Sequence, residues 1–162
     1  MRLLLVQHGV AKSKDEDPDR PLRSEGADTV SRMAAWGAEQ GLGVDEIRHS
    51  GKRRAAETAE ILGVHLQPAL GVRVAPGLAP LDDVRPVAEE LGGEDDIVML
   101  VGHLPFLARL AGFLLTGSPE ATPVRFTNAG IVCLEGGQGG WELAWSVPPQ
   151  LLQTADTDAA DG

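Results

Sequence analysis

The chain has no tyrosine, one cysteine and few aromatic residues, which make up 4% of its 162 residues. Its core must therefore be built mainly from Leu, Val, Ala and Ile. Because the single cysteine, Cys133, cannot form an internal disulfide, we expect a reducing compartment such as the cytoplasm. No apolar run approaches the roughly 20 residues of a membrane span. The apolar run of residues 3–6 is also shorter than the roughly 7–15 residues of a signal-peptide core.

Positive charge is also scarce. The chain has 14 Lys and Arg against 24 Asp and Glu, which gives a net charge of −10 and a pI near 4.7. This balance argues against nucleic acid or an anionic membrane as the main partner, and it makes any local basic cluster informative. No cluster of metal-ligating residues stands out, so neither a metal nor another cofactor is predicted.

Short apolar runs alternate with segments of helical periodicity. We expect strands within 3–6, 44–49, 71–75 and 96–102, and helices at 24–43, 52–62, 82–91 and after Pro105. Ser24 would cap the first helix. Ser50 would cap the second, with donation to a phosphate as its alternative role, and Gly63 would end that helix. Residues 126–134 and 141–147, joined by the glycine-rich segment 136–140, predict an antiparallel hairpin.

This order of elements predicts an α/β fold: a three-layer α/β/α sandwich whose central sheet is mostly parallel, with the antiparallel C-terminal hairpin at its edge. The length fits one domain, which we place at residues 1–150. Residues 151–162 are predicted to form a flexible acidic tail.

Two histidines follow predicted strands. His8 comes after the first strand and His103 after the strand that ends at Gly102. Ligands of open α/β sheets bind beyond the carboxyl ends of the strands, so two neighbouring strands would bring both rings into one cleft. A neutral imidazole, with an ordinary pKa of roughly 6.5, can attack phosphorus near pH 7. Gly9 would let the backbone approach a phosphate closely.

Basic residues occur at two further places. Arg20 lies in the loop after the first strand, and Lys52, Arg53 and Arg54 open the second helix. Cations at a helix N-terminus oppose the helix dipole, at a cost of roughly 0.3–1 kcal/mol each. Three in a row suggest that they face an anion such as phosphate. The alternative is a solvated basic turn.

Five segments, in this order along the chain, resemble the histidine phosphatase superfamily, and its SixA-type phosphohistidine phosphatases in particular. They are residues 4–9 (LLVQHG), 20–22 (RPL), 50–59 (SGKRRAAETA), 101–105 (VGHLP) and 126–129 (FTNA). The resemblance implies a phosphatase that works through a covalent phosphohistidine without a metal. A phosphorylated protein or a small phosphorylated metabolite would be the partner, and inorganic phosphate the product.

The resemblance also implies roles for individual residues. His8 matches the nucleophile, and His103 matches the second histidine that contacts the phosphoryl oxygens. Arg54 and Arg20 match the arginines of the phosphate pocket. The same pocket would include Gln7, Gly9 and Leu104. Asp83 falls where some members carry sequence around a carboxylate proton donor, although capping a helix is an alternative role for it.

One position departs from the family pattern, since the usual Arg-His-Gly is here Gln7-His8-Gly9. A neutral amide in place of a guanidinium would remove roughly 1–2 kcal/mol of transition-state binding, which slows a reaction about tenfold or somewhat more. Three functions therefore stay open. They are a SixA-like protein phosphohistidine phosphatase, a small-molecule phosphatase or mutase of the same superfamily, and a non-catalytic module that binds phosphate or phosphoproteins.

Overall fold

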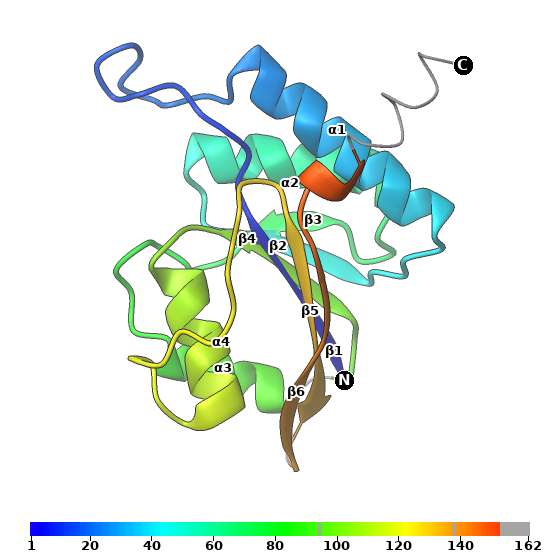
Figure 1. Cartoon of the computed structure of the whole chain (residues 1–162), viewed down its shortest axis with the longest axis vertical. Coiled ribbons are helices and arrows are strands. Elements are labelled where there is room, and N and C mark those ends of the chain that lie inside the picture. Colours follow the sequence, from blue (N-terminus) through cyan, green and yellow to red (C-terminus); the bar gives the residue numbers. More distant parts are fainter. Residues whose placement is uncertain (94, 138, 153–162) are drawn as a thin grey trace.

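The protein is described here as a computed structural model that covers residues 1–93, 95–137 and 139–152 (Figure 1). Its elements follow one another in the order β1 (Arg2–Gln7), α1 (Ser24–Glu39), β2 (Glu46–His49), α2 (Arg53–Leu66), β3 (Val72–Val74), α3 (Arg85–Gly92), β4 (Val98–Gly102), α4 (Phe106–Thr116), β5 (Ile131–Gly137) and β6 (Gly140–Val147). The six strands form one sheet in the order β3-β2-β4-β1-β5-β6.

The sheet lies between two pairs of helices, as predicted. Strands β3, β2, β4 and β1 are parallel, whereas β5 runs antiparallel to β1 and β6 antiparallel to β5. Helices α1 and α2 cover one face, and α3 and α4 cover the other (Figure 1). Strand β1 is buried on both faces, because Leu3 and Leu5 pack toward α3 and α4 while Leu4 and Val6 pack toward α1 and α2.

Two predicted helix boundaries are wrong. Helix α2 continues through Gly63 to Leu66 and ends at Gln67, whose φ of 48° is left-handed. Glycine at position 63 serves packing rather than termination, because a Cβ there would come within 2.6 Å of Val72 Cγ2 on the adjacent strand β3. Ser24 is not the N-cap of α1, since it is the first helical residue and Arg23 occupies the cap position.

The hairpin is shifted relative to its prediction. Its first strand begins at Ile131 rather than at residue 126, and Gly136, Gly137 and Gly140 belong to the strands rather than to the turn. Residues 126–130 instead form a loop at the end of β1, where the Ala129 N–H donates to the Gln7 carbonyl at 2.9 Å. This hydrogen bond places the loop beside the end of the strand that precedes His8.

The last described residues lie where the predicted domain meets its predicted tail. Gln150, Leu151 and Leu152 form a short helical turn, and Leu152 packs against the core on the α1–α2 face. The rest of the predicted acidic tail, from residue 153 onward, lies outside the described residues. In the described part of the chain, no helix combines the length and the apolar character needed to cross a membrane.

Candidate active site

The structure brings His8 and His103 together at the carboxyl end of the sheet. Strands β1 and β4 are parallel neighbours, and Gln7 is paired with Gly102, so the residue after each strand lies at the same level. The two imidazole centroids are 5.1 Å apart, and the rings are tilted by 53°. Backbone pairing continues one step further, because the His8 N–H donates to the Gly102 carbonyl at 3.0 Å.

His8 is held with one ring nitrogen engaged. Its Nδ1 lies 2.7 Å from the Gly9 carbonyl oxygen, which can only accept, so Nδ1 carries the proton. In the neutral ring, Nε2 then carries the lone pair. Burial lowers the pKa of His8, and the charges of Arg54 and Arg20 lower it further, against the opposing effect of the Gly9 hydrogen bond. His8 is therefore neutral, and nucleophilic at Nε2, at pH 7.

His103 carries its proton on the same nitrogen as His8, but its other nitrogen, Nε2, is the one engaged. Its side chain is buried, with 2% exposure, and its Nε2 lies 2.6 Å from Ser50 Oγ. Burial lowers the pKa of His103 to about 3, with Arg54 the next largest cause, so the ring is neutral. The Ser50 hydroxyl accepts the Lys52 N–H at 3.3 Å and can donate its own hydrogen to Nε2. Nδ1 of His103 then bears a proton, and it is buried with no partner among the described residues.

Ser50 was expected to cap helix α2, and that expectation is wrong. The cap position is occupied by Lys52, without a side-chain hydrogen bond. The sequence did offer a signal for the actual role. Ser50 directly follows β2, which is the strand beside β4, so its side chain stands at the same edge of the sheet as His103.

The basic turn at the start of α2 divides into outward and inward charges. Arg53 is exposed and lies 3.9 Å from Asp19 and 3.8 Å from Glu57. Arg54 is partly buried, and its Nε is buried without a partner among the described residues. Its charge lowers the pKa of both histidines, which places it at the site. Arg54 is the cation of the turn whose charge acts on both rings, whereas the charge of Lys52 acts on His103.

Arg20 is held by an unusual backbone conformation. Its φ is 50°, in the left-handed region that costs a non-glycine residue roughly 1–3 kcal/mol. Its Nε donates to the Lys12 carbonyl at 3.1 Å, and its charge acts on His8 and Arg54. The loop is tied to α2 because Glu57 accepts the Leu22 N–H at 2.9 Å. This role of Glu57 was not predicted from the sequence.

Gly9 has a packing role that the sequence analysis missed. A Cβ at this position would come within 2.8 Å of Val30 Cγ2, so glycine allows the backbone to pass close to α1. Its N–H donates to the hydroxyl of buried Thr58 at 3.0 Å, and that hydroxyl donates to the Arg54 carbonyl at 2.7 Å. Thr58 thus links the loop after His8 to the turn that carries Arg54. A polar residue among the alanines of the α2 core face was the available signal.

The remaining predicted residues lie beside the histidines or away from them. Gln7 and Leu104 line a neighbouring cavity of about 490 Å³, where the Gln7 Oε1 is buried without a partner in the described chain. Asp83 is exposed at the start of α3, where it accepts the Arg85 N–H at 3.1 Å and pairs with the Arg85 guanidinium. No hydrogen bond or ion pair joins Asp83 to either histidine among the described residues.

The chemistry of the site follows from these contacts. A neutral imidazole with a free Nε2 faces a region where the described chain leaves two buried donors, Arg54 Nε and His103 Nδ1, without acceptors. A tetrahedral oxyanion supplies acceptor oxygens for both donors and a negative charge for the Arg54 guanidinium. Among the described residues, no group of three His, Cys, Asp or Glu side chains could hold a metal ion.

Comparison with known proteins agrees with this geometry. No family model matches the chain. It is 29% identical to the phosphohistidine phosphatase SixA of Escherichia coli over 96% of this chain and 98% of that protein. It is 33% identical to an uncharacterised protein of Picosynechococcus, over 85% of this chain and 86% of the other.

The three-dimensional comparison gives the same relationship. The structure of the protein histidine phosphatase SixA complexed with tungstate superposes with a TM-score of 0.84 and 29% identity, over 94% of this chain and 99% of that one. The likeness therefore extends through the whole domain, in sequence and in fold. The chain is a homologue of the phosphohistidine phosphatase SixA and shares the fold of the histidine phosphatase superfamily.

Proposed function

We propose that this chain is a phosphohistidine phosphatase that removes the phosphoryl group from a phosphorylated protein and releases inorganic phosphate. The observation that carries the proposal is the pair of neutral imidazoles 5.1 Å apart, one with a free nucleophilic nitrogen and the other with a free donor, beside the Arg54 guanidinium. The homologous SixA structure is a complex with tungstate, an oxyanion that resembles phosphate in shape.

In the first step, the Nε2 lone pair of His8 forms a bond to phosphorus while the P–N bond of the substrate phosphohistidine breaks. The electron pair of the broken bond stays on the departing nitrogen, which takes a proton from solvent, so that the imidazole leaves as a neutral molecule. Arg54, Arg20 and the Nδ1–H of His103 stabilise the charge on the phosphoryl oxygens. Such a leaving group makes little demand on a strong protein acid, and Asp83 contacts Arg85 rather than either histidine.

In the second step, a water oxygen forms a bond to phosphorus while the bond from phosphorus to His8 Nε2 breaks. The electron pair returns to Nε2, the proton of the attacking water goes to solvent, and inorganic phosphate leaves. The cations that stabilise the first transfer serve the second equally, because the same phosphoryl oxygens carry the charge.

The free thiol of Cys133 is buried, and we place the protein in the cytoplasm, where this thiol stays reduced.

The direct test is to trap the intermediate. Wild-type protein is mixed with a peptide carrying ³²P-labelled phosphohistidine and quenched at alkaline pH, where phosphohistidine survives. We expect transient label on His8 and release of labelled phosphate. His8→Asn should lose both, with turnover at least about a thousandfold lower. His65→Asn, at an exposed histidine of α2, is the matched control and should behave as wild type. Near-normal turnover by His8→Asn would exclude His8 as the nucleophile.

A further inference from the structure

Two cavities next to the active site share part of their lining. The cavity of about 490 Å³ beside the histidines and a second one of about 320 Å³ are both lined by Thr127 and Gln150. Together they form what we call the flanking groove. Its near end is lined by Gln7 and Leu104, its middle by Thr127 and Gln150, and its far end by Arg125 and Ser146.

The near end of the groove is joined directly to the catalytic histidines. Gln7 is the residue before His8, and Leu104 is the residue after His103. Asn128, which lines the same end, donates its side-chain N–H to the His8 carbonyl at 2.9 Å. A molecule whose phosphoryl group meets the histidines can therefore continue into the groove without leaving the protein surface.

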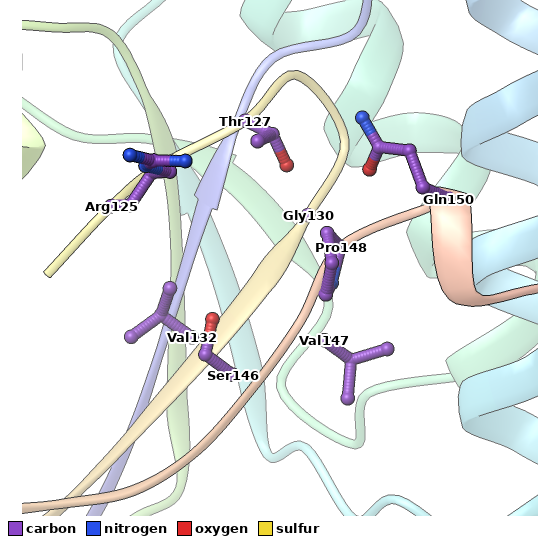
Figure 2. Close-up of a pocket in the computed structure, with 8 residues that line it drawn as sticks. All are labelled: Arg125, Thr127, Gly130, Val132, Ser146, Val147, Pro148 and Gln150. Atoms are coloured by element: carbon purple, nitrogen blue, oxygen red, sulfur yellow. The ribbon is translucent and has the colours of Figure 1, made fainter.

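The polar side chains of the groove are free to bind a ligand. Figure 2 shows Thr127 and Gln150 reaching into the cavity from opposite sides, with Arg125 on the loop that precedes β5. Among the described residues, the side chains of Arg125, Thr127, Ser146 and Gln150 make no hydrogen bond or ion pair with the rest of the chain. The groove thus offers hydroxyl and amide groups suited to a peptide backbone and one cation suited to a carboxylate.

Charge gives the groove its selectivity. The chain carries a net charge of −10, so most of its surface repels an acidic partner. Arg125, which has no ion-pair partner among the described residues, places a positive charge at the end of the groove that lies away from the histidines. A carboxylate there would gain a charge-assisted hydrogen bond, whereas a basic side chain would be repelled.

We propose, on the basis of the phosphatase function above, that the flanking groove binds the segment of the phosphorylated protein next to its phosphohistidine, and that Arg125 pairs with an acidic side chain of that segment. The groove then selects among phosphorylated proteins, while the histidines and arginines act on the phosphoryl group alone. Because Arg125 is exposed, its substitution is expected to leave the fold intact.

The test measures binding separately from turnover. We use fluorescent phosphohistidine peptides that carry either three glutamates or three lysines, placed either before or after the phosphohistidine. Each peptide is titrated with His8→Asn protein, and binding is followed by fluorescence anisotropy. We expect one glutamate peptide to bind at least about tenfold more tightly than its lysine counterpart. Arg125→Glu should remove this preference, and 0.5 M salt should weaken it. Arg109→Glu, an equal charge reversal in a separate cavity, is the control and should retain the preference.

Three results would overturn the proposed role of the groove. The first is equal affinity for the glutamate and lysine peptides, and the second is a loss of preference in Arg125→Glu no larger than that in Arg109→Glu. The third concerns Arg125→Glu in protein that retains His8: turnover of a small aryl phosphate would fall as much as turnover of the peptides. The last result would make Arg125 part of the phosphoryl site. Failure of the phosphatase function looks different, because wild-type protein would then release phosphate from none of the peptides, whatever their relative affinities.

Discussion

Acidification should destabilise this protein through one buried ring. Burial and the surrounding cations hold the pKa of His103 at about 3 in the folded chain, whereas the unfolded chain has an ordinary histidine pKa near 6.5. Below pH 6.5 the unfolded chain therefore binds a proton that the folded chain does not, and the free energy of unfolding falls as the pH falls. At pH 5, about 1.5 units below the ordinary value, this ring alone lowers the free energy of unfolding by about 2 kcal/mol.

The measurement is urea unfolding at pH 7.5 and pH 5.0 in buffers without phosphate, followed by tryptophan fluorescence. Trp36 and Trp145 pack against the core and report its loss. For wild type, the His103 contribution at pH 5 corresponds to a fall in the urea midpoint of roughly 1 M. His103→Gln removes the titrating ring, so its free energy of unfolding should fall by about 2 kcal/mol less than that of wild type over the same change of pH. Other titrating groups act equally in both proteins and cancel in this comparison.

His65→Gln is the matched control, because it removes an exposed histidine and leaves the buried ring in place. It should keep the wild-type dependence on pH. If His103→Gln and wild type lost the same free energy between pH 7.5 and pH 5.0, the folded ring would also be protonated at pH 5. The neutral donor that we assign to His103 would then be wrong.

Three further substitutions test the site through turnover of an aryl phosphate. Arg54→Gln should lower kcat/KM by about 10- to 100-fold through loss of charge-assisted hydrogen bonds. Arg53→Gln, at the exposed neighbouring residue, should change kcat/KM less than about threefold. Similar losses in the two variants would contradict the division of the turn into an inward and an outward charge. Ser50→Ala should lower kcat by about tenfold with little change in KM, because the ring of His103 loses the contact that fixes its proton on Nδ1. A ¹⁵N NMR spectrum of Ser50→Ala that still showed a fixed Nδ1 proton would contradict this role of Ser50. Gln7→Arg should raise kcat/KM by about tenfold, and an unchanged or lower value would mean that Gln7 does not face the phosphoryl group.

The sheet and its layers could be predicted because the signals are local. The run from Leu3 to Val6 is apolar at every position, as expected for a strand covered on both faces, and the structure confirms that burial. Helix ends were less predictable because they depend on distant neighbours. Gly63 looked like a helix stop, yet it serves the close approach of Val72 on a strand that follows the helix.

Chain order predicted part of the site, and tertiary contacts supplied the rest. The meeting of His8 and His103 follows from two strands that are adjacent in the sheet, which their position after apolar runs suggested. The contact between Ser50 and His103 spans 53 positions, and the hydrogen bond from Gly9 to Thr58 spans 49. Nothing local distinguishes a capping serine from one that fixes the proton of a buried histidine ring, so only the packed structure reveals these links.

An arginine in place of Gln7 is expected to act on the proposed nucleophile, His8, as well as on the phosphoryl group. Arg54 and Arg20 already lower the pKa of His8 through their charges, and a third cation in Gln7→Arg would lower it further. A lower pKa moves the acidic limb of the kcat/KM profile to lower pH, whereas better stabilisation of the phosphoryl oxygens raises its plateau at neutral pH. Gln7→Arg should therefore show both changes. A raised plateau with an unmoved limb would mean that the new guanidinium acts from the neighbouring cavity, where Gln7 now lies, without approaching the His8 ring.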